Sequence, residues 1–207
     1  MEKDISDSPK FLKHYTSLEN LLSILLTKEL RLADPNKWDD KNDIASVSAY
    51  ARHYSVSVKV LCLTHDKETV HHWNTYAKQS PGCRIDFDTE IFLDRVKNIT
   101  GLIYGEMKYL SRPFDLSPYT VDDYPFLKRL PYECENEYRI VWKGNGEAPP
   151  IPIEGLISRV TLSPYLGSRF AGDICDLLRE KYGIKEVCNS AILEYNQWTA
   201  KFEGNTG

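Results

Sequence analysis

A charged run with an apolar continuation stands out in the second half of the sequence: Glu135-Asn136-Glu137-Tyr138-Arg139, followed by Ile140-Val141-Trp142. The continuation favours a β-strand, because β-branched and aromatic side chains suit a pleated sheet. Side chains alternate faces along a strand, so Glu135, Glu137 and Arg139 would share one face. Such a face can be a solvated surface or a structural ion pair, and it can also stabilise positive charge in a reaction. Taken alone, the motif slightly favours the structural alternatives.

Polar groups at the ends of other predicted strands add to these candidates. His14-Tyr15-Thr16 stands where a first strand passes into a helix, a place that often holds an anionic or hydroxyl-rich ligand. Thr64 ends a central apolar strand with a hydroxyl group. A single histidine more often has a structural role than a ligand-binding one, and Thr16 has a ready structural role as a helix N-cap.

Two aromatic residues, Trp73 and Tyr76, are spaced i, i+3 on a predicted helix over 69–78 and would share one face of it. Packing of Trp73 in the core is the more common outcome for such a residue. The alternative is an aromatic wall, which near carboxylates would suit a flat heterocycle such as nicotinamide.

Composition limits the classes of protein to consider. The 207 residues are 42% hydrophobic, enough for a single domain with its own core. The net charge of −4 comes without a Lys/Arg-rich block, so no broad electrostatic grip on nucleic acid is indicated, although a local groove stays open. No stretch approaches the ~18 apolar residues of a membrane span, and we expect no membrane partner.

Cysteine and motif content exclude further classes. The five cysteines are odd in number and form no C-x-x-C pair, which favours free thiols in a reducing cytoplasm. The histidines lack the spacing of zinc ligands, so no metal is expected. No Gly-rich phosphate loop, Walker sequence or G-x-S-x-G elbow occurs, so the usual signs of a kinase, nucleotidase, esterase or classical dehydrogenase are missing.

Periodicity and turn residues predict one domain over 1–207, with a core at about 11–193, an irregular insertion at about 111–130 and a flexible tail at 204–207. Thr16 and Glu19 match a capping box ahead of a leucine-rich helix that runs to about residue 28. Further helices are predicted over 44–53, 69–78, 89–96 and 166–178, and strands over 10–15, 30–32, 58–63, 83–87, 101–110, 136–143, 151–153, 160–162 and 185–193. A hairpin-like turn is predicted at 144–146. The mixture lacks a strict βαβ rhythm and therefore favours the α+β class.

The order of several short motifs resembles a widespread bacterial family known only as a domain of unknown function. The motifs are His14-Tyr15-Thr16-Ser17-Leu18-Glu19-Asn20-Leu21, Leu61-Cys62-Leu63-Thr64, Trp73-Asn74-Thr75-Tyr76-Ala77, Gly82-Cys83-Arg84-Ile85-Asp86-Phe87 and Glu135-Asn136-Glu137-Tyr138-Arg139-Ile140. The resemblance spans about residues 11 to 193. The loop at 38–43 departs from the family's pattern, and Thr64 stands where the family has serine.

That family is in turn similar to ADP-ribosyltransferase-like domains, which implies a split, mostly antiparallel sheet with flanking helices. The implied activity is cleavage of NAD, without a metal, and transfer of ADP-ribose to a macromolecule, either protein, DNA or RNA. The opening motif also resembles DNA-modifying members of the superfamily. The bacterial proteins among which the family occurs suggest a toxin or phage-defence context.

The resemblance also implies roles for individual residues. Glu137 would be catalytic, and Glu135 would orient the acceptor. NAD would be bound by the set His14, Tyr15, Thr16, Thr64, Trp73, Tyr76 and Arg139, of which Arg139 would hold a phosphate or set the carboxylate geometry. The competing hypothesis is a non-catalytic nucleotide- or nucleic-acid-binding module with the same fold. If the enzyme hypothesis is right, His14, Thr64 and Glu137 should share one pocket.

Overall fold

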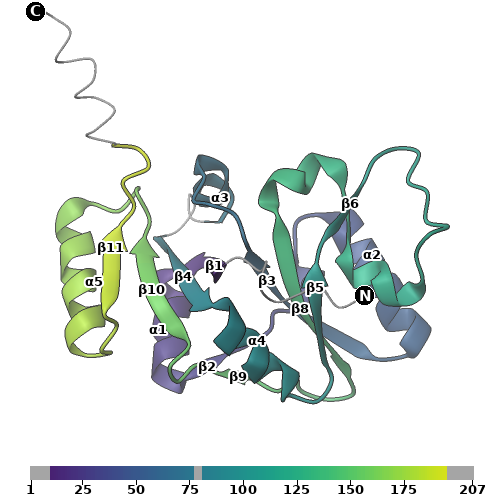
Figure 1. The fold of residues 1–207 in the computed structure, drawn as a ribbon, viewed down its shortest axis with the longest axis horizontal. Helices are drawn as coiled ribbons and strands as arrows, with labels where there is room; N and C mark the ends of the chain where they lie inside the picture. Colours follow the sequence, from purple (N-terminus) through teal and green to yellow (C-terminus); the bar gives the residue numbers. More distant parts are fainter. Residues whose placement is uncertain (1–9, 77–80, 195–207) are drawn as a thin grey trace, which may run out of the picture.

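A seven-stranded sheet forms the centre of the computed structural model, which describes residues 10–76 and 81–194. Its strand order is β11-β10-β4-β1-β3-β8-β5, and every neighbouring pair is antiparallel except β10 and β11. Helices flank the sheet, with α5 beyond one end and α2 beyond the other (Figure 1). The α+β class with a mostly antiparallel sheet, predicted from the sequence, is confirmed.

The bounds of the elements follow the predicted ones closely. The helices are α1 (Leu18–Thr27), α2 (Lys41–Tyr54), α3 (Val70–Tyr76), α4 (Thr89–Lys97) and α5 (Ser168–Glu180), with 3-10 turns η2 (Pro35–Lys37), η3 (Val121–Phe126) and η4 (Leu130–Glu135). The strands are β1 (Phe11–Ser17), β2 (Glu29–Leu30), β3 (Ser57–Thr64), β4 (Gly82–Asp88), β5 (Leu102–Glu106), β6 (Lys108–Leu110), β7 (Leu127–Arg129), β8 (Glu137–Gly144), β9 (Ile151–Pro152), β10 (Ile157–Leu162) and β11 (Glu186–Asn189).

Two hydrophobic clusters hold β3 and β8 between them. Leu61, Leu63 and Ile140 belong to the main core, together with buried residues of α1, α4 and α5. Val60 and Val141 point to the other side and pack against α2. Because both faces of these strands are covered, the sequence shows near-continuous apolar runs there instead of strict alternation.

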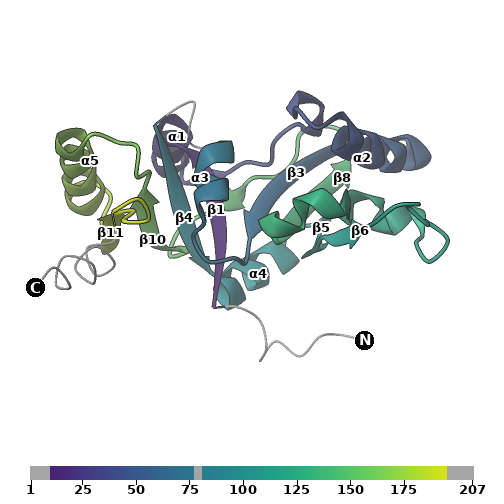
Figure 2. The same ribbon diagram turned by 90° about the horizontal axis from the view of Figure 1, so that it is seen from above.

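The sheet is split between β1 and β3, the feature that positions the site. The two strands pair at one position, Lys13 opposite Thr64, whereas β1 pairs with β4 along its whole length. Further along β3, the backbone of Val60 bonds that of Ala33, with N–O distances of 2.8 and 2.9 Å. The halves β10–β4–β1 and β3–β8–β5 splay apart when seen from above (Figure 2).

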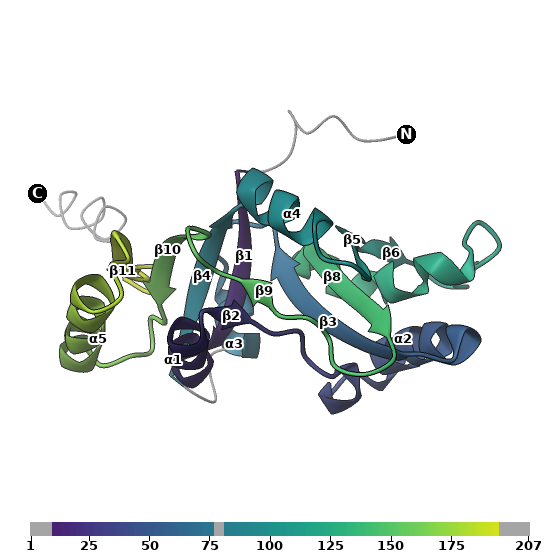
Figure 3. The ribbon, with the colours of Figure 1, turned by 90° about the horizontal axis from the view of Figure 1, so that it is seen from below.

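Two local predictions need correction. The residues at 144–146 do not close a hairpin, because β8 pairs with β3 and β5, and the next strand, β9, pairs with β2. The pair β2–β9 runs beside α1 (Figure 3). The insertion at 111–130 is irregular in part, but β7 pairs with β6 in parallel, and this pairing brings Lys128 towards the main sheet.

The N-cap of α1 is Ser17, not Thr16 as predicted. The Ser17 hydroxyl oxygen accepts a hydrogen bond from the backbone N–H of Asn20 at 3.1 Å. The Thr16 hydroxyl oxygen accepts instead from the Asn20 side-chain amide at 3.0 Å. The helix therefore begins one residue later than the capping box indicated, because β1 continues through Ser17.

We expect Ser17→Ala to lower the free energy of unfolding by about 1 kcal/mol, because it removes the oxygen that satisfies a free N–H in the first turn. Thr16→Ala should cost less, since its partner is a side chain that can bond water instead. Urea unfolding of both variants measures the difference. Equal costs, or a larger cost for Thr16→Ala, would show that the helix begins where the sequence predicted.

Candidate functional site

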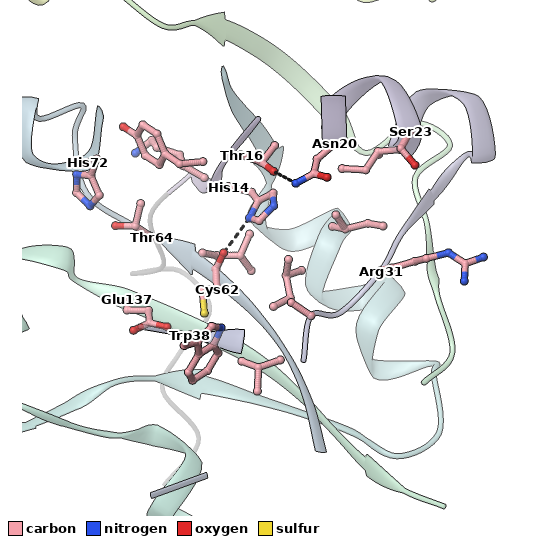
Figure 4. Close-up of a pocket in the computed structure, with 18 of the residues that line it drawn as sticks. His14, Thr16, Asn20, Ser23, Arg31, Trp38, Cys62, Thr64, His72 and Glu137 are labelled. Carbon is pink, nitrogen blue, oxygen red and sulfur yellow. Dashed lines mark hydrogen bonds between the residues drawn. The ribbon is translucent and has the colours of Figure 1, made fainter. Parts of the chain in front are cut away.

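A cavity of about 530 Å³ opens where the sheet splits, between β1 and α1 on one side and β3 on the other. We call it the split cavity. Its size is within the usual range for small-molecule sites. The residues of the sequence motifs that line it are His14, Tyr15, Thr16, Asn20, Leu61, Cys62, Leu63, Thr64, Glu135 and Glu137. Further polar residues are Lys13, Ser23, Thr27, Glu29, Arg31 and His72. His14 lies midway between the Glu137 end and the Arg31 end (Figure 4).

The side chain of His14 connects β1 to β3 across the split, where the two strands pair at one position. Its Nδ1 lies 2.9 Å from the carbonyl oxygen of Cys62 on β3. A carbonyl oxygen can only accept, so Nδ1 carries the proton and Nε2 of the neutral ring is an acceptor. Burial lowers the pKa of His14, although the bond to the Cys62 carbonyl acts in the other direction. The split cavity thus contains a neutral imidazole whose Nε2 can accept a hydrogen bond from a hydroxyl group.

Glu137 and Arg139 lie on the α2-facing side of β8, as the strand alternation predicted. Arg139 Nε donates to Glu137 Oε1 at 2.6 Å, and Nη2 donates to Oε2 at 3.1 Å. On α2, Asp43 accepts from Nη1 and Nη2 at 2.9 and 2.6 Å. Arg139 is fully buried, and the expectation that it holds a phosphate is wrong, because these carboxylates and the carbonyl oxygen of Pro125 occupy its N–H groups.

Lys128 completes this group of charges. Its Nζ lies 2.5 Å from Glu135 Oε2, 2.9 Å from Glu137 Oε2 and 3.6 Å from Asp43 Oδ2. We call Asp43, Lys128, Glu135, Glu137 and Arg139 the buried ion cluster. Burial acts to raise the pKa of Glu137, but Arg139 and Lys128 outweigh it and lower the pKa to about 2. Glu137 is therefore ionised at any physiological pH.

The sequence did not indicate Asp43 or Lys128 as members of the site. Asp43 is 96 residues from Arg139 and lies in a polar stretch where an acidic residue is unremarkable. Lys128 lies in the segment predicted to be an irregular insertion. The one available signal was the cost of burying the Glu135–Arg139 face, which requires partners without naming them.

Thr64 lies at the split cavity, but its hydroxyl group has structural partners. The hydroxyl donates towards the carbonyl oxygens of Glu135 (2.8 Å) and Asn136 (3.2 Å), and it accepts from the backbone N–H of Asp66 at 3.0 Å. Thr64 thus ties the start of β8 to the end of β3 and sets the position of the two glutamates.

The aromatic residues are arranged differently from the prediction. Trp73 does not line the split cavity: it is fully buried, its ring meets Tyr15 edge-on at 5.0 Å, and its Nε1 donates to Glu68 at 2.6 Å. The Tyr76 side chain is outside the described residues. Tyr15 and Trp38 are the aromatic residues at the split cavity.

Tyr15 and Trp38 are each held by a second ring or charge. Tyr15 stacks on His72 with 5.1 Å between ring centroids, and the Trp38 ring lies 4.9 Å from the Arg139 guanidinium carbon. His72 is fixed by Thr69 at Nδ1 (2.6 Å) and by the carbonyl oxygen of Glu135 at Nε2 (3.3 Å). These contacts give the split cavity rigid aromatic sides near its Glu137 end.

Clustered metal ligands and membrane-spanning helices are both missing from the described part of the chain. Within residues 10–76 and 81–194, no group of three or more histidine, cysteine, aspartate or glutamate side chains is placed to hold a metal ion. Over the same ranges, no helix has the length and apolar content to cross a bilayer.

Comparison with known proteins gives a distant structural likeness. No protein-family model and no curated protein matches the sequence. The fold resembles that of DarT. The structure of Thermus sp. 2.9 DarT in complex with NAD+ is 12% identical, with a TM-score of 0.48 over 90% of this chain and 98% of that one. The complex of the same protein with ADP-ribosylated ssDNA is 13% identical, with a TM-score of 0.47 over 90% and 97% of the two chains.

Membership of the uncharacterised bacterial family stays a prediction, since no family model matches.

The two buried histidines give a testable pH dependence. Burial lowers the pKa of both His14 and His72. Below about pH 6.5 the unfolded chain therefore binds more protons than the folded one, and stability present above that pH is lost as the pH falls through it. We expect the free energy of unfolding to fall between pH 7.5 and 5.5. Urea unfolding at both pH values measures the effect. His14→Gln should reduce the change in the free energy of unfolding, and substitution of an exposed histidine, His53→Gln, should leave the change unaltered. A wild-type free energy of unfolding that does not depend on pH would contradict the prediction.

Proposed function

We propose that this chain is an ADP-ribosyltransferase that binds NAD in the split cavity. In this reaction the bond between ribose C1′ and the nicotinamide nitrogen breaks, and its electron pair leaves with nicotinamide. A nucleophile of the acceptor then forms a bond to C1′ and loses a proton. Positive charge develops on the ribose between the two events, so the site needs a fixed negative charge there.

The observation that supports this proposal most strongly is the placement of His14 and Glu137 on the same cavity. His14 Nε2 is an acceptor suited to a ribose hydroxyl. Glu137 is ionised and held in place by Arg139 and Lys128, so it stabilises charge without first reorganising. Tyr15 and Trp38 offer faces for the nicotinamide ring, a role that the sequence suggested for Trp73, which does not line the cavity.

Glu135 is proposed to receive the acceptor's proton or to orient its nucleophile, because it adjoins Glu137 through Lys128 and lines the cavity. The acceptor is proposed to be a macromolecule, either protein, DNA or RNA. The cytoplasmic location and the toxin or phage-defence context stay predictions.

The second candidate function is a binding module without turnover. One observation favours it: Glu137 and Arg139 pair with each other in a fully buried cluster, as a purely structural ion pair would. A carboxylate in that role needs no substrate.

Incubation of the purified protein with adenine-labelled NAD, together with separate pools of protein, DNA and RNA, separates the two functions. The enzyme proposal predicts release of nicotinamide and label transferred to one pool. Saturable NAD binding without nicotinamide release would favour the binding module. If the protein neither binds NAD nor releases nicotinamide, the enzyme proposal and an NAD-binding module are both excluded, and a module that binds nucleic acid alone is left.

A further inference from the structure

Within residues 10–76 and 81–194, the side chain of Lys128 joins the two cavity-lining glutamates, Glu135 and Glu137. It comes from β7, outside the main sheet, and its side chain is only 8% exposed. A single ammonium contacts Oε2 of both Glu135 and Glu137, at 2.5 and 2.9 Å. Two ionised oxygens that contact the same ammonium lie close enough to repel each other strongly without it.

Arg139 does not replace Lys128 in this role. Its five N–H groups are directed to Glu137 (Nε and Nη2), Asp43 (Nη1 and Nη2) and the carbonyl oxygen of Pro125 (Nη1). A guanidinium has no sixth donor for Glu135. Among the described residues, Lys128 is therefore the cation that contacts the carboxylates of both Glu135 and Glu137.

The charges of the cluster leave one negative charge uncompensated, because three carboxylates face two cations. Glu135 and Glu137 line the split cavity, whereas Arg139 does not. The excess negative charge therefore lies on the cavity side, where a cation-like transition state would form.

We propose that Lys128 is a positioning residue: it holds the carboxylate groups of Glu135 and Glu137 side by side at the split cavity, so that both act on the substrate. This inference rests on the proposed function for the reaction it serves. Lys128 itself is not among the residues that line the split cavity, and its Nζ lies over the Tyr132 ring at 5.0 Å from the ring centroid.

Removal of the ammonium should change the protonation of the pair. Two neighbouring carboxylates in a desolvated site share a proton instead of both ionising. The groups that face the pair from the packed elements are Asp43 (α2), Cys62 (β3), His72 (α3), Tyr109 (β6), Tyr132 (η4) and Arg139 (β8). Of these Arg139 alone is a permanent cation, and its N–H groups are already engaged, so the pair in a Lys128→Met variant takes up a proton at a higher pH than in the wild type.

The test compares Lys128→Met, Lys128→Arg and, as matched control, Lys108→Met, whose ion pair with Asp123 is half exposed. Nicotinamide release from NAD is measured from pH 5.5 to 8.5. We expect Lys128→Met to gain an acidic limb, with kcat falling about tenfold per pH unit below its midpoint while KM changes little. Lys128→Arg should have the same dependence of kcat on pH as the wild type, because arginine keeps the positive charge. The control Lys108→Met should also have the wild-type dependence. A loss by the same factor at every pH would overturn the proposal.

A second readout does not depend on turnover. In the wild type the pKa of Glu137 is lowered to about 2, so its contribution to stability is complete above the unfolded pKa of about 4.3 and stays constant from pH 5 to 8. In folded Lys128→Met the carboxylate pair binds a shared proton. The stability that this proton contributes is present at low pH and is lost as the pH rises. The gap in Tm between wild type and Lys128→Met should therefore widen from pH 5 to 8, while the gap for Lys108→Met stays constant.

The two readouts separate the two proposals. If the wild type releases no nicotinamide at any pH, the proposed function fails, and the reaction assigned to Lys128 fails with it. If the wild type is active but the Tm gap for Lys128→Met is independent of pH, the positioning role is overturned and the proposed function stands.

Discussion

Glu137→Gln should reduce nicotinamide release by about 10²–10³-fold, the usual cost of removing a well-placed electrostatic group. The amide keeps the shape of the side chain but carries no charge to oppose the cation that develops on the ribose. NAD affinity should fall less, because His14, Tyr15 and Trp38 supply contacts that exist before the bond breaks.

The same substitution should also lower the Tm, because Glu137 is buried and bonded to both Arg139 and Lys128. Activity must therefore be measured well below the Tm of the variant, with the folded fraction determined on the same sample. Glu133→Gln is the matched control, since Glu133 is exposed in the neighbouring turn η4 and should retain full activity. A folded Glu137→Gln variant with wild-type release would remove Glu137 from the mechanism.

Arg139→Met should cost about 3–5 kcal/mol of stability, the largest effect on folding that we expect of any single substitution here. The guanidinium is fully buried and bonds two carboxylates from different elements, Asp43 on α2 and Glu137 on β8. Its loss leaves both acids near a single cation, Lys128, in a site with little water.

Arg159→Met provides the control for this prediction. Arg159 also makes a two-pronged contact with a carboxylate, Glu186, but both side chains are largely exposed. An exposed pair of this kind should contribute only about 0–1 kcal/mol. Urea unfolding of both variants tests the contrast. Similar small losses for Arg139→Met and Arg159→Met would show that the buried ion cluster is not a structural requirement.

The sequence was sufficient for the fold class and for most elements, because periodicity and turn residues are local signals. The near-continuous apolar run at 58–63 is typical of a strand covered on both faces, and β3 has a hydrophobic cluster on each face. The predicted N-cap, Thr16, is one residue before the observed one, Ser17. The two residues are chemically similar, and only the length of β1 decides between them.

The site was predictable only in part, for a physical reason. Spacing indicates which residues share a face but not what that face contacts, so Trp73 could be placed on a helix face without showing that it packs against Tyr15. Lys128 and Asp43 reach Glu137 through the pairing of β6 with β7 and the packing of α2. Those contacts depend on tertiary structure and leave no local pattern in the sequence.

Titration of NAD into the protein, followed by the NMR signals of the histidine rings, tests most directly whether the split cavity is the substrate site. His14 and His72 line the cavity, whereas His53 is exposed on α2 and does not. We expect the His14 and His72 signals to shift with one saturable dependence on NAD concentration while the His53 signal stays in place. Saturable NAD binding that leaves the His14 signal unmoved would contradict the account, because the substrate would then bind elsewhere.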